Sequence, residues 1–133
     1  MSLDLADCQT VRVIDTSKDC PDIPLVEGGG SAKVVTWPGN GAIHRTFHLL
    51  TLDSGSKTIE LNHPHDSVYY VISGGGTVAE VASGDRTPLQ EGSMVHIDAG
   101  DGYQFEAEAM RGMTLLGGPC PADLRLYASL SQS

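Results

Sequence analysis

The sequence predicts an antiparallel β-sandwich or β-barrel, and two observations lead to that fold class. The chain of 133 residues contains 16 Gly and 7 Pro, residues that end short strands at frequent turns. Between the turns lie short stretches in which apolar and polar residues alternate, as in half-buried strands. No helical pattern connects these stretches, which disfavours a parallel sheet with its crossover helices. The length fits one domain, and we interpret residues 1–133 as a single domain.

The alternating stretches predict ten short strands, which are Thr10–Ile14, Lys33–Trp37, Ala42–Leu52, Lys57–Leu61, Val68–Ser73, Thr77–Ala82, Thr87–Gln90, Ser93–Ile97, Tyr103–Ala107 and Gly112–Leu116. The glycine triplets Gly28–Gly30 and Gly74–Gly76 are interpreted as plain turns. Neither is followed by the Lys and Ser or Thr of a phosphate-binding loop. After Pro121 apolar residues recur at a spacing of three, so we expect a short C-terminal helix or tail.

The charge of the chain excludes several classes of partner. Acidic residues outnumber basic residues by 17 to 8, giving a formal net charge of -9. This charge repels a nucleic-acid backbone and an anionic membrane, so we expect neither as a partner. The apolar run Val68–Ile72 is too short to span a bilayer, and Met1–Asp7 lacks signal-peptide features. Cys8, Cys20 and Cys120 form no CxxC pair, so a reducing, cytoplasmic location is expected.

Residues 55–74 show a regular spacing of glycines around one histidine. Gly55 is followed by five residues and then by a Leu-Asn-His triplet that ends at His63. Three further residues lead to Ser67, and six more lead to Gly74. The glycines mark the ends of predicted strands, so the segment has the form of two strands that flank a histidine-bearing loop.

Residues 92–107 form a second segment of this kind. Gly92 is followed by five residues and then by Asp98–Gly100. Two residues separate Gly100 from Tyr103, and Ala107 completes the series. The two segments resemble the first and second motifs of the cupin family. This resemblance covers the middle of the chain and implies an all-β, cupin-type jelly-roll β-barrel. Such a barrel encloses a cavity that is open at one end and can bind a small molecule.

The resemblance also points to positions where cupins bind a metal ion. Family members use two His and one Glu of the first motif and one His of the second. Here those positions hold Leu61, His63, Ser67 and Tyr103. Leu does not bind a metal, and a neutral Ser or Tyr is a poor replacement for a carboxylate or an imidazole. We therefore expect no cofactor and no stoichiometric transition metal.

An alternative interpretation retains a divalent transition metal. His63-Pro64-His65 is itself a His-x-His sequence. On an extended strand, residues two apart point to the same face, so both imidazoles can reach one cation. Under this alternative, the chain is a metal-dependent cupin enzyme, a dioxygenase, lyase or isomerase, that uses His63 and His65.

The main interpretation is that the chain binds a small organic molecule inside the barrel without the usual metal. A histidine near neutral pKa and a phenol can exchange protons with a substrate, so we assign His63 and Tyr103 as the acid–base pair. The Tyr103 hydroxyl is then expected inside the barrel, within hydrogen-bond reach of His63. Ser67, Tyr69 and a partly buried His96 are expected as ligand-binding residues. The corresponding activities are those of a non-metal isomerase, epimerase or cyclase.

Assembly is the last expectation. Cupins commonly dimerise. The first two predicted strands, Thr10–Ile14 and Lys33–Trp37, can expose a sheet edge that pairs with a second chain. We expect a homodimer with Trp37 near the contact.

Overall fold

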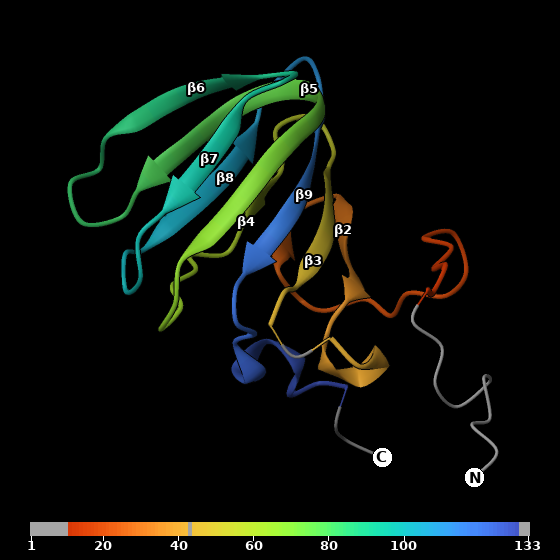
Figure 1. Cartoon of the computed structure of the whole chain (residues 1–133). Helices are drawn as coiled ribbons and strands as arrows, with labels where there is room; N and C mark the ends of the chain where they lie inside the picture. Colours follow the sequence, from red (N-terminus) through yellow and green to blue (C-terminus); the bar gives the residue numbers. More distant parts are fainter. Residues whose placement is uncertain (1–10, 43, 131–133) are drawn as a thin grey trace, which may run out of the picture.

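The structure, a computed structural model, describes residues 11–42 and 44–130 as an antiparallel β-barrel (Figure 1). Nine strands are present in this part of the chain. They are β1 (Val26–Glu27), β2 (Gly30–Thr36), β3 (Phe47–Leu52), β4 (Lys57–Thr58), β5 (Ser67–Glu80), β6 (Arg86–Gln90), β7 (Met94–Ile97), β8 (Tyr103–Ala107) and β9 (Met113–Pro119). Two short 3-10 helices, η1 (Pro38–Asn40) and η2 (Leu124–Tyr127), complete the elements.

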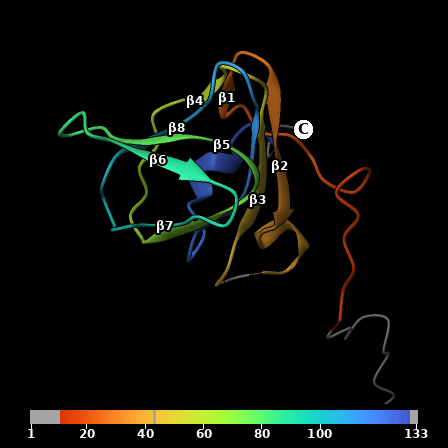
Figure 2. The same cartoon turned by 90° about the horizontal axis from the view of Figure 1, so that it is seen from above.

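The long strand β5 belongs to both layers of the barrel. Its first half pairs with β7 and β9, and its second half pairs with β6 and β8. The main strand order is β1-β4-β8-β5-β9-β3-β2, and all the pairings are antiparallel. Seen from above, the strands curve around a common interior (Figure 2). The predicted all-β jelly-roll barrel is confirmed.

Alternation along the strands determines which side chains face the interior. On β8, Tyr103, Phe105 and Ala107 are buried while the residues between them are partly exposed. On β3 the buried positions include His48 and Leu50. Because side chains alternate between the two faces of a strand, these residues form one inner layer. The core therefore consists largely of Leu, Val and aromatic residues, with a polar group at one end.

The prediction of a turn at Gly74–Gly76 is wrong. These glycines lie inside β5, which joins the two predicted strands Val68–Ser73 and Thr77–Ala82 into one. A Cβ atom on Gly76 would lie 2.0 Å from the backbone oxygen of Glu106 on the neighbouring strand. The triplet therefore lets β5 bend from one layer into the other where backbones approach closely.

Two expectations for the ends of the chain also need correction. Residues 11–14 form no strand, and Thr10 lies outside the described residues. Val11 and Val13 are exposed, so this alternation does not reflect a buried face. At the other end, the expected helix is only η2, which starts at Leu124, three residues beyond Pro121. No helix of the described residues has the length and apolar character needed to cross a membrane.

The segment that contains η2 closes one end of the barrel. Tyr127 is buried, and its hydroxyl lies 2.7 Å from Nε2 of His48 on β3. The Trp37 ring packs on Tyr127 with a centroid distance of 4.9 Å. His48 is completely buried, and its Nδ1 atom has no hydrogen-bond partner in the described part of the chain. Burial, and then the nearby His63, lower the pKa of His48 to about 4.

This buried histidine predicts a loss of stability below neutral pH. Unfolded His48 takes up a proton below pH ~6.5, whereas the folded side chain stays neutral down to about pH 4. The free energy of unfolding is therefore highest above the pKa of the unfolded His48 side chain, and it declines as the pH falls below that value. From pH 7 to pH 5 we expect the free energy of unfolding to fall by about 2 kcal/mol on this account.

Urea unfolding of wild type and His48→Gln at pH 7 and pH 5 checks this expectation. Gln keeps an acceptor for Tyr127 but has no proton to gain, so its pH dependence should be weaker by that amount. The exposed His65 provides the control variant His65→Gln. A pH dependence that is unchanged in His48→Gln would contradict the assignment.

Candidate functional site

The polar group inside the barrel centres on three side chains from three segments. Nε2 of His63, in the loop between β4 and β5, lies 2.7 Å from the hydroxyl of Tyr103 on β8. That hydroxyl lies 2.6 Å from the hydroxyl of Tyr69 on β5. All three side chains are buried. The predicted hydrogen bond between His63 and Tyr103 inside the barrel is confirmed.

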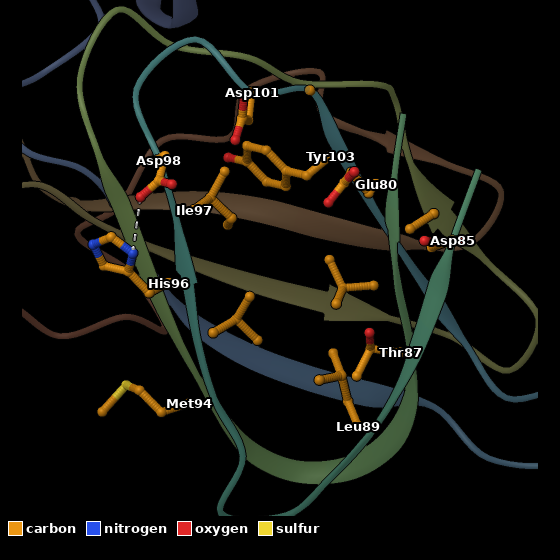
Figure 3. A pocket seen from close by; sticks show the side chains of 14 residues that line it. Glu80, Asp85, Thr87, Leu89, Met94, His96, Ile97, Asp98, Asp101 and Tyr103 are labelled. Carbon is orange, nitrogen blue, oxygen red and sulfur yellow. Dashed lines mark ion pairs between the residues drawn. The ribbon is translucent and has the colours of Figure 1, made fainter. Parts of the chain in front are cut away.

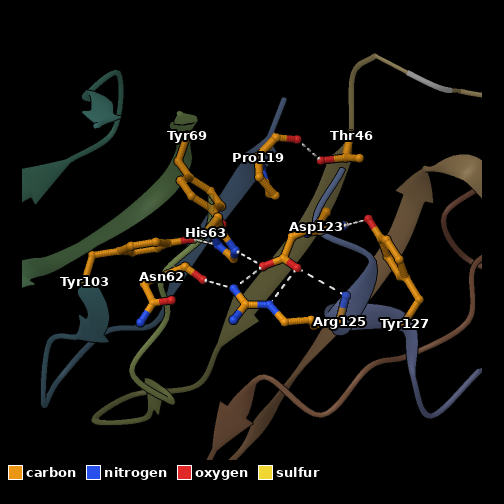
Figure 4. Close-up of polar contacts among 10 residues, drawn as sticks. Thr46, Asn62, His63, Tyr69, Tyr103, Pro119, Asp123, Arg125 and Tyr127 are labelled. Carbon is orange, nitrogen blue, oxygen red and sulfur yellow. Dashed lines mark hydrogen bonds and ion pairs between the residues drawn. The ribbon is translucent and has the colours of Figure 1, made fainter. Parts of the chain in front are cut away.

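A carboxylate from the C-terminal segment orients the histidine (Figure 4). Oδ2 of Asp123 lies 2.8 Å from Nδ1 of His63. Asp123 is 3% exposed and is held by Arg125, whose Nε and Nη2 atoms donate to its two oxygens at 2.9 and 2.8 Å. Arg125 also donates to the backbone oxygen of Asn62, next to His63. The tail and the histidine loop are thus joined by charge-assisted hydrogen bonds.

These contacts determine where the protons lie. Hydrogen bonds from Arg125 hold the pKa of Asp123 far below its usual range, so this carboxylate is charged and accepts from Nδ1 of His63. Burial lowers the pKa of His63, against the opposing effect of Asp123, so the ring is neutral and its Nε2 is an acceptor. Tyr103 therefore donates to His63, and Tyr69 donates to Tyr103. Burial, followed by the nearby Tyr69, raises the pKa of Tyr103, which keeps its proton.

The other predicted ligand-binding residues lie in different surroundings. Ser67 is 1% exposed on β5, and its hydroxyl makes no hydrogen bond of ordinary geometry to the described residues. His96, in contrast, is exposed, so the expectation of a partly buried ring is wrong. Its ring lies 3.7 Å from Asp66 and 3.5 Å from Asp98. Outward-facing positions of β7 alternate with inward-facing Val95 and Ile97, and His96 occupies an outward position.

The residues present do not fit a cupin metal centre. Both ring nitrogens of His63 are engaged, by Asp123 and by Tyr103. The His-x-His alternative required an extended strand, but a bend at residues 64 and 65 breaks the alternation, and His65 is exposed while His63 is buried. Over residues 11–42 and 44–130, no three His, Cys, Asp or Glu side chains are grouped to hold a metal ion. His63 therefore has no free ring nitrogen with which to bind a metal ion.

A cavity of about 470 Å³ lies beside this polar group, between β6 and β7 (Figure 3). Tyr103 contributes to its lining, together with apolar side chains that include Val78, Leu89, Val95 and Ile97. Tyr103 thus connects the cavity to His63 and Asp123. Thr87 and several carboxylates also line it, so the cavity combines apolar walls with convergent polar groups, as small-molecule sites commonly do.

Sequence reasoning missed Asp123 and Arg125. An Asp directly before apolar residues is a helix N-cap signal, and the Asp123 side chain does accept from the backbone N–H of Arg125 in η2. That signal predicts a local cap only. Contact with His63, 60 positions earlier, arises because the chain after β9 folds back across the end of the barrel.

Several solved structures share this fold. A cupin-like protein from Thermotoga maritima has 19% identity and a TM-score of 0.66, covering 77% of this chain and 74% of its own. The polyketide cyclase RemF from Streptomyces resistomycificus has 15% identity and a TM-score of 0.68, covering 85% and 83%. KdgF from a Halomonas species has 19% identity and a TM-score of 0.65, covering 85% and 96%. At these identities the likeness establishes the fold alone.

No curated protein sequence matches this chain. The family model described as a cupin domain matches residues 48–116, more than half of the chain. The matched range contains both segments whose glycine spacing resembles the cupin motifs. The chain therefore belongs to the cupin domain family.

Proposed function

We propose that the barrel binds a small organic molecule and that His63 and Tyr103 act on it as an acid–base pair without a metal ion. The observation that carries the proposal is the chain of hydrogen bonds from Asp123 through His63 to Tyr103. Of these three residues, Tyr103 lines the cavity. Reactions of this class move protons at carbon: isomerisation, epimerisation or cyclisation.

The geometry supports a defined proton path. When a substrate loses a proton beside a carbonyl group, the Tyr103 oxygen accepts that proton while its own proton passes to Nε2 of His63. The imidazolium that forms is stabilised by the Asp123 carboxylate on the opposite nitrogen. The reverse transfer returns a proton to the substrate. Tyr69 donates to the Tyr103 oxygen during the step and orients it.

The similar structures do not select one reaction. Their titles include a polyketide cyclase and a predicted oxalate decarboxylase, and one fold hosts many chemistries. Support for the proposed reaction class comes from the hydrogen-bonded residues of the site.

Deuterium exchange tests the acid–base pair without knowledge of the natural substrate. A panel of small ketones and aldehydes is incubated in D2O with the protein, and deuterium incorporation beside the carbonyl is followed by NMR. We expect wild type to accelerate exchange for a probe that binds the cavity. Loss of a general acid–base group should slow this exchange by about 100-fold or more in Tyr103→Phe.

Tyr127→Phe is the matched control, because Tyr127 is a buried tyrosine outside the cavity lining. It should keep the exchange activity. Equal exchange in Tyr103→Phe and wild type would refute the assignment. So would exchange at the buffer rate for every carbonyl compound that binds.

The side chains at the cupin ligand positions predict that the purified protein contains no stoichiometric transition metal. Elemental analysis of protein purified without a His tag should detect less than one Zn, Fe, Mn or Ni per chain. The reason is that Leu61, Ser67 and Tyr103 stand where a cupin metal needs imidazole or carboxylate ligands. One metal ion per chain that is lost in His63→Ala would overturn this prediction and favour the metal-dependent alternative.

We also propose that the protein is a cytoplasmic homodimer. Val68, Tyr70 and Ile72 on the outer face of β5 are 42%, 43% and 42% exposed, and adjacent exposed apolar side chains are typical of an interface. Trp37 remains the predicted neighbour of the contact, although part of its ring packs on Tyr127. Light scattering at micromolar concentration should give about twice the chain mass of 14.0 kDa. A mass equal to one chain would contradict the dimer.

A further inference from the structure

The cavity between β6 and β7 combines negative charge with the absence of basic side chains. Four carboxylates are part of its lining: Glu80, Asp85, Asp98 and Asp101. No Lys or Arg is among the described residues that line it, and its one histidine, His96, is exposed at the rim. An anionic ligand would meet an unfavourable potential here.

Most of this charge has no ion-pair partner among the described residues. Asp98 lies 3.5 Å from His96. In the part of the chain that the structure describes, no ion pair includes Glu80, Asp85 or Asp101. The nearest basic residue in sequence, Arg86, pairs with Glu106 at 2.8 Å instead, and neither residue lines the cavity. The carboxylates of the lining are therefore available to a cation.

An aromatic ring stands beside these carboxylates. Glu80 on β5 is directly opposite Tyr103 on β8 in the strand register, so their side chains share the inner face. Figure 3 shows the Tyr103 ring between Glu80 and Asp101. The remaining walls are apolar, including Val78 and Leu89. Carboxylates next to an aromatic ring and an apolar wall are the features that recognise an organic ammonium group.

A buried hydroxyl on the same inner face lacks a partner. Ser67 is paired with Ile97, and Tyr69 with Val95, so all four side chains share one face of the sheet. Ile97 and Val95 line the cavity. Ser67 is 1% exposed, and its Oγ atom, near the Tyr103 hydroxyl, makes no hydrogen bond of ordinary geometry to the described residues. An unsatisfied buried hydroxyl indicates a polar group of a ligand or a water at this depth.

We propose that the ligand of this barrel is a small organic cation, an ammonium group on an apolar body. The ammonium lies against Glu80, Asp101 and the Tyr103 ring, and the apolar body packs on the aliphatic walls. This inference rests on the proposed function, because it names the substrate class of the same cavity.

Three probes of equal shape and different charge test the inference: benzylammonium, benzyl alcohol and benzoate. The amides of Ile97, Gly102 and Tyr103 report binding in a two-dimensional NMR titration at pH 7. We expect benzylammonium to bind about tenfold more tightly than benzyl alcohol, with benzoate the weakest. The preference for the cation should shrink between 20 mM and 200 mM salt, because salt screens the rim carboxylates.

Glu80→Gln should weaken benzylammonium binding about fivefold and leave benzyl alcohol binding unchanged. Glu91→Gln is the matched control, since it removes the same charge from an exposed turn outside the cavity lining. Benzyltrimethylammonium then shows whether the site takes a quaternary or only a protonated amine.

Equal binding of benzylammonium and benzyl alcohol would overturn the inference, and so would tighter binding of benzoate. The absence of shifts at the cavity amides for all three probes would overturn it as well. These outcomes are separable from failure of the proposed function, which is measured by deuterium exchange into carbonyl probes. Exchange that is lost in Tyr103→Phe, without any preference for the cation, would leave the acid–base pair standing and reject only the ligand class.

Discussion

The buried carboxylate of Asp123 is the constraint on which the site depends. A buried charge is costly unless it is paired and hydrogen-bonded, and Arg125 and His63 satisfy both oxygens. In return, the charge places the proton of His63 on Nδ1 and leaves Nε2 as an acceptor. Tyr103 must then donate to His63, so the direction of the whole hydrogen-bond chain follows from one ion pair. The same contacts tie the C-terminal segment to the end of the barrel.

The identity of the side chain at position 103 changes the chemistry of the fold. A cupin metal centre would have an imidazole there, with ligands at positions 61 and 67. This chain has a phenol at that position, and both ring nitrogens of His63 are hydrogen-bonded, one to Tyr103 and the other to Asp123. A phenol, unlike an apolar side chain at that position, has both a proton to donate and an oxygen that accepts a hydrogen bond. The barrel interior therefore keeps a polar group that can donate and accept a proton, which is the basis of the proposed acid–base function.

The polar groups in the barrel interior differ from those that line the cavity between β6 and β7. Deep inside, the buried polar side chains of the described residues are hydrogen-bonded, apart from the Ser67 hydroxyl and Nδ1 of His48. In the cavity between β6 and β7, the lining residues Glu80, Asp85 and Asp101 have no ion-pair partner among the described residues. Under the two proposals, the carboxylates at the rim of the cavity select the ligand by charge, and the interior supplies the proton path. The inference of a cationic ligand and the acid–base proposal therefore rest on different residues, apart from Tyr103.

The sequence by itself determined the antiparallel barrel, because glycine spacing and alternation encode turns and half-buried strands locally. It also determined that His63 and Tyr103 share the interior, since both stand at family motif positions inside the barrel. Tertiary structure alone decided that Gly74–Gly76 lie within a strand, because close approach of the Glu106 backbone makes glycine necessary there. It alone brought Asp123 to His63 and exposed both His65 and His96. Asp123 reaches His63 because the chain after β9 folds back, and local sequence patterns carry no information about contacts 60 positions apart. His65 is exposed because the chain bends at residues 64 and 65, and His96 because it occupies an outward position of β7.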